Sequence, residues 1–121
     1  MSEIMVVDDE ENMVELIRDV LESEGFNVVT AFNGGECLNK LKEGVPDLIL
    51  LDMKMPVMDG IETLEEIKKV DDNLSVVFLS AVKISLAEFI SLKKRFNLRG
   101  YLIKPVTKKE LLDVIGDVLS S

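Results

Sequence analysis

Five short apolar segments recur along this chain, and an amphipathic segment of helical length follows each of them. The apolar segments are Ile4–Val7, Phe26–Ala31, Leu48–Leu51, Val76–Leu79 and Tyr101–Ile103. The third and fourth are apolar throughout, which is typical of strands buried on both faces of a parallel sheet. Alternating strands and helices build right-handed crossovers and place helices on both faces of such a sheet. The pattern therefore predicts a doubly wound α/β domain with a five-stranded parallel sheet.

The segments between these runs have the spacing and the end signals of one-sided helices. Apolar residues recur with helical spacing at Met13, Leu16, Ile17, Val20 and Leu21, and again at Leu111, Ile115, Val118 and Leu119. Asn33, Asp59 and Thr107 each stand three residues before a glutamate, which is the spacing of a capping box. Gly25 and Gly44 lie where the first two helices are expected to end.

Composition narrows the chemistry that the chain can perform. The 121 residues suffice for one domain, and they include no His, no Trp and one Cys, Cys37. A Ser-His-Asp triad, a Cys-His pair, an internal disulfide and a phosphohistidine carrier are therefore excluded. The net charge of −9 disfavours nucleic acids and anionic membrane surfaces as direct partners. A lone cysteine without a signal-peptide pattern leads us to expect a cytoplasmic protein.

Polar residues follow four of the five apolar runs. Asp8 and Asp9 come after the first run, Asp52 after the third, Ser80 after the fourth and Lys104 after the fifth. Each of these residue types also serves in turns and helix caps, so none is specific alone. In an open doubly wound sheet, however, ligands bind outside the carboxyl ends of the strands. The coincidence of four strand ends predicts a functional site at that edge.

The three aspartates would repel one another strongly at this edge. At separations of about 5 Å and an effective dielectric of about 20, each pair of carboxylates costs roughly 3 kcal/mol. Solvent, protonation and Lys104 relieve part of this cost, and a hard cation such as Mg²⁺ relieves it best. We therefore expect a Mg²⁺-dependent phosphoryl site with Asp52 as the nucleophile. Lys104 and the Ser80 hydroxyl would stabilise the charge that develops during transfer.

Four motifs at these positions resemble the receiver domain of two-component response regulators. They are Val-Asp-Asp-Glu at 7–10, Leu-Asp-Met-Lys-Met-Pro-Val-Met-Asp-Gly at 51–60, Leu-Ser-Ala at 79–81 and Tyr-Leu-Ile-Lys-Pro at 101–105. The resemblance covers essentially the whole chain. It implies the flavodoxin-like strand order 2-1-3-4-5 and one receiver domain over residues 1–121, without an effector domain.

The resemblance also implies a role for each site residue. Asp52 would be the phosphoacceptor, Lys104 would pair with the phosphoryl group, and the bond to Pro105 would be cis. Ser80 would be the switch hydroxyl, and Tyr101 would follow it by rotating inward. The Mg²⁺ ligands would be Asp8, Asp9, Asp52 and the backbone carbonyl of Lys54.

The implied partners are proteins. A histidine kinase or a phosphohistidine carrier would donate the phosphoryl group, and the domain would catalyse its own phosphorylation and dephosphorylation rather than turn over a substrate. A downstream protein would recognise a changed surface formed by the fourth helix, fifth strand and fifth helix, and a dimer linked to phosphorylation is compatible with this scheme. The alternative is a receiver-like interaction module that is not phosphorylated.

Two other classes fit less well. A flavodoxin-like electron carrier needs a phosphate loop after the first strand, where this chain has the acidic run 8–11. An aspartate-nucleophile phosphatase places a second Asp two residues after its nucleophile, and this chain has Glu10 there.

The segment between Ser80 and Tyr101 departs from the usual receiver pattern. It is slightly longer, and Asn97 stands where the family commonly has Gly, so we expect a left-handed backbone there. The fourth helix has more apolar residues than one buried stripe needs, and we interpret them as core packing, with a partner surface as the alternative for part of them. They are Ile84, Leu86, Phe89, Ile90, Leu92 and Phe96. Cys37 is expected to be a small buried residue of the second helix.

Overall fold

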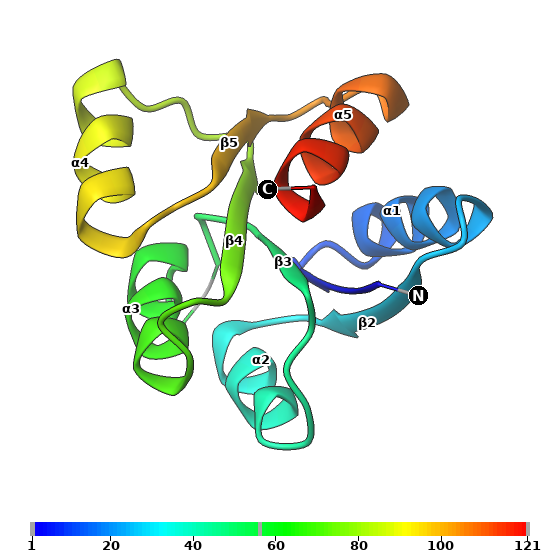
Figure 1. The fold of residues 1–121 in the computed structure, drawn as a ribbon, viewed down its shortest axis with the longest axis horizontal. Coiled ribbons are helices and arrows are strands. Elements are labelled where there is room, and N and C mark those ends of the chain that lie inside the picture. The colour runs from blue at the N-terminus through cyan, green and yellow to red at the C-terminus, as the bar shows by residue number, and fades with distance from the viewer. Residues whose placement is uncertain (1, 56, 121) are drawn as a thin grey trace.

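The structure, a computed structural model, describes residues 2–55 and 57–120 as alternating strands and helices (Figure 1). The strands are β1 (Glu3–Val7), β2 (Asn27–Ala31), β3 (Leu48–Leu51), β4 (Ser75–Ser80) and β5 (Gly100–Ile103). The helices are α1 (Glu11–Ser23), α2 (Gly34–Leu41), α3 (Gly60–Val70), α4 (Leu86–Phe96) and α5 (Lys108–Leu119).

All five strands are parallel and lie in the order β2-β1-β3-β4-β5. This order confirms the predicted doubly wound fold. Val7 of β1 pairs with Leu51 of β3, and Leu51 pairs with Phe78 of β4. The carboxyl ends of β1 and β3 are therefore level, and β4 continues two residues further to Ser80, so the residues at these ends lie on one edge.

The sheet separates two apolar layers. Helices α1 and α5 cover one face, and α2, α3 and α4 cover the other (Figure 1). Alternate residues of β1 enter different layers, since Met5 packs with the second group of helices and Ile4 with the first. This two-sided burial explains why the central strands are apolar except at the ends of β1 and β4.

The helix ends follow the predicted signals. Backbone N–H groups three residues downstream donate to the Asn33 and Asp59 side chains at 2.8 and 2.9 Å. Thr107 forms a reciprocal capping box, and so does Ser85, which the sequence analysis did not single out. Asn97 ends α4 with a left-handed backbone (φ 54°, ψ 41°), which confirms the expectation for that position.

Three apolar residues of two helices are more exposed than the helical patterns predicted. In α1 the core-facing residues include Val14, whereas Leu16 is 61% exposed. In α4 the buried residue is Leu92, whereas Leu86 and Ile90 are 74% and 44% exposed. Core packing therefore holds for the other apolar residues of this segment but not for Leu86 and Ile90, for which the alternative of a partner surface stays open. One side of a helix meets the sheet, and Leu86 and Ile90 lie on the other side.

Two side chains that can ionise, those of Cys37 and Lys68, are buried in the structure. Cys37 is fully buried as expected, and its burial raises the pKa of the thiol to about 12. Lys68 of α3 is also buried, which the sequence analysis missed. Its Nζ donates to the carbonyls of Asp72 and Leu74 at 3.3 and 2.6 Å, so it joins the end of α3 to the start of β4. Within the described residues, no helix is long and apolar enough to cross a membrane.

Gly60 is predicted to be intolerant of a side chain. A Cβ at this position would lie 2.5 Å from Met53 Cα and 2.6 Å from the Asp52 carbonyl oxygen, which are backbone atoms. We expect Gly60→Ala to lower the free energy of unfolding by about 1–3 kcal/mol, measured by urea denaturation. Gly116 of α5 meets no atom within 4 Å and serves as the control. Gly116→Ala should raise stability by about 0.5–1 kcal/mol, and equal effects at both glycines would contradict the prediction.

Candidate phosphoryl-transfer site

Backbone hydrogen bonds extend the sheet by one residue beyond its strand ends. The N–H of Asp52 donates to the Val7 carbonyl at 2.9 Å, and the N–H of Lys104 donates to the Ser80 carbonyl at 2.9 Å. Asp8 is held in the same way by the carbonyl of Ala31 at 3.1 Å. The backbones of these three site residues are therefore fixed by the sheet rather than by mobile loops.

The three aspartates converge as predicted. One carboxylate oxygen from each of Asp8, Asp9 and Asp52 lies within 4.8 Å of the others. Asp8 and Asp52 are only 2% and 6% exposed, whereas Asp9 is exposed. Asp8 also accepts a hydrogen bond from the Glu10 N–H at 3.0 Å, and Asp52 accepts one from the Lys54 N–H at 3.2 Å. These bonds orient the two buried carboxylates.

Lys104 supplies the balancing positive charge. Its Nζ lies 2.5 Å from Asp8 Oδ2, 3.7 Å from Asp52 Oδ2 and 3.9 Å from Glu10 Oε1. Burial lowers the pKa of Lys104, but the hydrogen bond to Asp8 and the three nearby carboxylates outweigh it and raise the pKa overall. Lys104 therefore remains an ammonium group at neutral pH. The peptide bond that follows it, to Pro105, is cis as the resemblance implied.

Ser80 and Tyr101 are joined through one residue, Val82. The buried Ser80 hydroxyl accepts a hydrogen bond from the Val82 N–H at 3.2 Å, and the Tyr101 hydroxyl donates to the Val82 carbonyl. The Tyr101 ring lies inward, with its centroid 5.7 Å from that of Phe78. Its hydroxyl is 3.5 Å from the sulfur of Met53. Burial raises the pKa of the Tyr101 phenol, which keeps this hydroxyl protonated and able to donate.

A cavity of about 220 Å³ opens at this edge of the sheet. It is lined by Asp9, Glu10, Asp52, Lys54, Ser80, Ala81, Val82 and Lys104. The structure thus brings together every residue that the sequence placed at the strand ends, with Asp8 next to Asp52 and Lys104. Tyr101 lies apart from the lining and reaches it through Val82. Val82 lies two residues after Ser80, a position that tends to tune hydrolysis in receiver domains, whereas no role was predicted for Glu10, which directly follows Asp9.

The donor atoms at this edge suit Mg²⁺. Carboxylate oxygens are hard ligands, and Mg²⁺ binds to proteins through one or two carboxylates together with phosphate oxygens and water. Asp8, Asp9 and Asp52 supply such oxygens, and the cavity beside them leaves room for the remaining ligands. The residues therefore fit this cation, and no sulfur or imidazole ligand lies in the described cluster to favour a softer metal.

A parallel sheet in this order, with an acidic cluster and a lysine at its carboxyl edge, defines a receiver domain of two-component signalling. The chain belongs to the response regulator receiver domain family, whose pattern it matches over residues 4–116. Receiver domains bind Mg²⁺ at an acidic pocket and interact with histidine kinases and downstream targets.

Individual relatives support this assignment over the whole chain. Chemotaxis protein CheY of Halobacterium salinarum is 35% identical over 119 residues, which cover 98% of both chains. The transcriptional regulatory protein CpxR homolog of Haemophilus influenzae is 41% identical, and this chain spans about half (51%) of its length. Response regulator protein TrrA of Thermotoga maritima, solved in complex with Mg²⁺-BeF, is 33% identical with a TM-score of 0.84. That comparison covers 98% of this chain and 99% of TrrA.

Removing the Lys104 ammonium is predicted to destabilise the fold. Lys104→Met leaves the buried Asp8 carboxylate beside Asp52 without its cation, which should cost about 3 kcal/mol of unfolding free energy in EDTA. Lys109→Met is the matched control, because Lys109 pairs with Asp113 at 2.8 Å on the exposed side of α5. The control should change little, since exposed ion pairs contribute little to stability. Urea denaturation measures both variants, and equal losses would contradict the prediction.

Proposed function

We propose that this domain accepts a phosphoryl group on Asp52 and carries the signal to a protein partner. The observation that carries the proposal is the convergence of three carboxylates within 4.8 Å beside a buried lysine. An arrangement of this kind costs stability, as the repulsion between the carboxylates shows. A binding module has no need of it, whereas phosphoryl transfer uses every one of these groups.

Each residue of the site would have its own role in the transfer of the phosphoryl group. Asp8, Asp9, Asp52 and the Lys54 carbonyl would hold Mg²⁺, which when bound supplies positive charge to the phosphoryl oxygens. Asp52 Oδ would attack phosphorus in line with the leaving group. Lys104, already within 3.7 Å of Asp52, would pair with a phosphoryl oxygen as charge builds there. The Ser80 hydroxyl would donate a hydrogen bond to another phosphoryl oxygen.

The donor would be a histidine kinase or a phosphohistidine carrier, as membership of the receiver family implies. This chain has no histidine that could carry the phosphoryl group itself. The domain would catalyse its own phosphorylation and the hydrolysis of its own phosphoryl group, rather than turn over a substrate. Residues 1–121 would form one receiver domain, and this domain would act in the cytoplasm.

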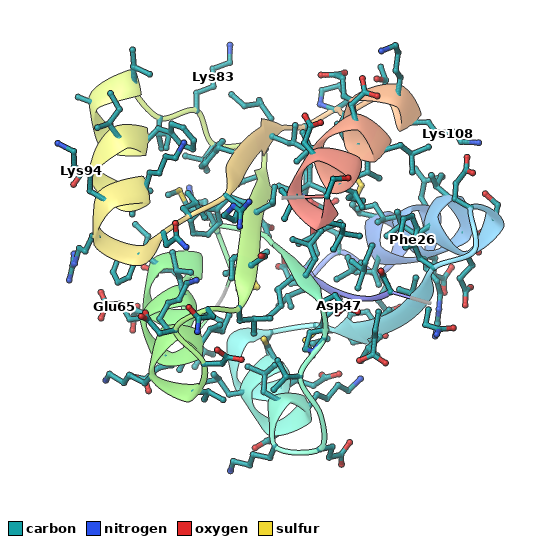
Figure 2. The ribbon with its side chains drawn as sticks, viewed as in Figure 1. Phe26, Asp47, Glu65, Lys83, Lys94 and Lys108 are labelled. Atoms are coloured by element: carbon teal, nitrogen blue, oxygen red, sulfur yellow. The ribbon has the colours of Figure 1, made fainter. Side chains whose placement is uncertain are left out.

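The signal would leave through the surface formed by α4, β5 and α5. Ser80 and Tyr101 both bond to Val82, at the start of the segment that leads into α4. The outer side of α4 carries the exposed Leu86, Ile90 and Lys94 (Figure 2), and Ile103 of β5 is 38% exposed. A movement of Ser80 toward a phosphoryl oxygen would therefore alter an apolar surface that a partner protein can recognise. A dimer formed through this surface on phosphorylation stays a prediction.

Intact-mass spectrometry tests the proposed acceptor. After incubation with acetyl phosphate and Mg²⁺, we expect the protein to gain the mass of one phosphoryl group, and to gain nothing in EDTA. Asp52→Ala should abolish the gain, whereas Asp19→Asn, at an exposed position of α1, should leave it unchanged. Undiminished modification of the Asp52 variant would refute the assignment. Failure with both acetyl phosphate and a phosphorylated histidine protein would favour the unphosphorylated interaction module.

Tyrosine fluorescence tests the proposed switch. Tyr101 is the single Tyr in a chain without Trp, so its emission reports on one ring. We expect phosphorylation to change this emission, because a shift of the Ser80 hydroxyl displaces the Val82 peptide to which Tyr101 is bonded. In Ser80→Ala the phosphoryl group should still form on Asp52 while most of the change in emission is lost. An unaltered change in that variant would show that Ser80 does not transmit the signal.

A further inference from the structure

Glu10 is a fourth carboxylate of the cavity that the proposed mechanism does not use. It lines the cavity with Asp52 and Lys104, and its Oε1 lies 3.9 Å from Lys104 Nζ. The Glu10 side chain is 66% exposed, whereas those of Lys104 and Asp52 are 8% and 7% exposed. Glu10 therefore lies, with the exposed Asp9, on the solvent side of the cavity, which a phosphodonor would have to pass.

The Glu10 carboxylate has one close charged partner among the described residues, Lys104. Glu10 is the residue before α1, and its side chain makes no capping hydrogen bond to that helix. Its backbone N–H, rather than its carboxylate, contacts Asp8. Lys104 already has a closer partner in Asp8 at 2.5 Å. The Glu10 charge would therefore also act on a charged group that enters the cavity.

We propose that Glu10 determines which class of phosphodonor the site accepts. Its carboxylate disfavours acyl phosphates and favours donors whose phosphoryl group is carried on nitrogen, such as phosphoramidate and phosphohistidine. The inference rests on the proposed phosphorylation of Asp52, and it adds a specificity-determining residue to that reaction.

The charge on the leaving group gives the physical reason. In both reactions an Asp52 oxygen forms a bond to phosphorus and the bond from phosphorus to the leaving atom breaks. With acetyl phosphate the bonding pair goes to oxygen, and acetate departs with a negative charge past Glu10. With phosphoramidate, whose nitrogen is protonated, the pair goes to that nitrogen and neutral ammonia departs. A carboxylate beside the departing group repels the first and attracts the cationic nitrogen of the second.

The experiment compares the two small donors at saturating Mg²⁺, with rates of phosphorylation followed by intact mass. Glu10→Gln removes the charge while nearly preserving shape, and circular dichroism checks its fold. We expect the ratio of the acetyl phosphate rate to the phosphoramidate rate to rise about fivefold, which corresponds to about 1 kcal/mol. This rise in the ratio of rates should become smaller at higher salt concentration, because the Glu10 carboxylate is exposed and salt screens its charge.

Two control variants isolate the charge at this position. Glu11→Gln removes the adjacent charge, which belongs to the first turn of α1 and does not line the cavity, and should leave the ratio unchanged. Glu10→Asp keeps the charge and should retain most of the wild-type preference. An unchanged ratio in Glu10→Gln, or an equal gain with both donors, would overturn the inference while leaving Asp52 as the acceptor. If neither donor modifies the wild-type protein, the proposed function fails and the inference with it.

Discussion

The sharing of one buried ammonium by two buried aspartates is the interaction on which this structure depends. Asp8 and Asp52 come from neighbouring strands, and Lys104 reaches both from the edge strand of the sheet. Because an unpaired buried carboxylate is costly, the Lys104 ammonium stabilises both aspartates, and its loss would leave two buried charges without a cation. Yet one ammonium cannot balance every carboxylate of the cluster. The excess negative charge is what makes the edge suited to a cation and a phosphoryl group.

The sheet holds the residues that carry this excess negative charge close together. Backbone hydrogen bonds continue beyond β1, β3 and β5 and hold the residues that carry the charges. Close packing reinforces this, since Gly60 lies against the backbone of Asp52 and Met53 with no room for a side chain. The aspartates cannot move apart without breaking the ladder beneath them. Apolar strands buried on both faces thus supply the rigidity that the polar edge requires.

Much of this could be predicted from the sequence, because strand ends in a parallel sheet have a fixed geometry. Once the five runs were recognised, Asp8, Asp52 and Lys104 had to meet at one edge. Contacts that depend on rotation of a helix, or on a turn of irregular backbone, could not be predicted in this way. Leu16 and Val14 satisfy the same helical spacing almost equally, and packing alone decides which faces the core. Lys68 is buried because two loop carbonyls accept hydrogen bonds from its ammonium group. No periodicity in the sequence reveals these hydrogen bonds.

The distance along the chain between the parts of the site has a consequence for when signalling can begin. Asp8 and Lys104 are 96 residues apart, and the strands that carry them lie on either side of β3 and β4. The surroundings of Asp52 are therefore complete only after the last strand has docked. A nascent or locally unfolded chain still contains Asp52 but lacks the assembled pocket around it. Under the proposed function, only fully folded molecules would be competent for phosphorylation and hence for signalling.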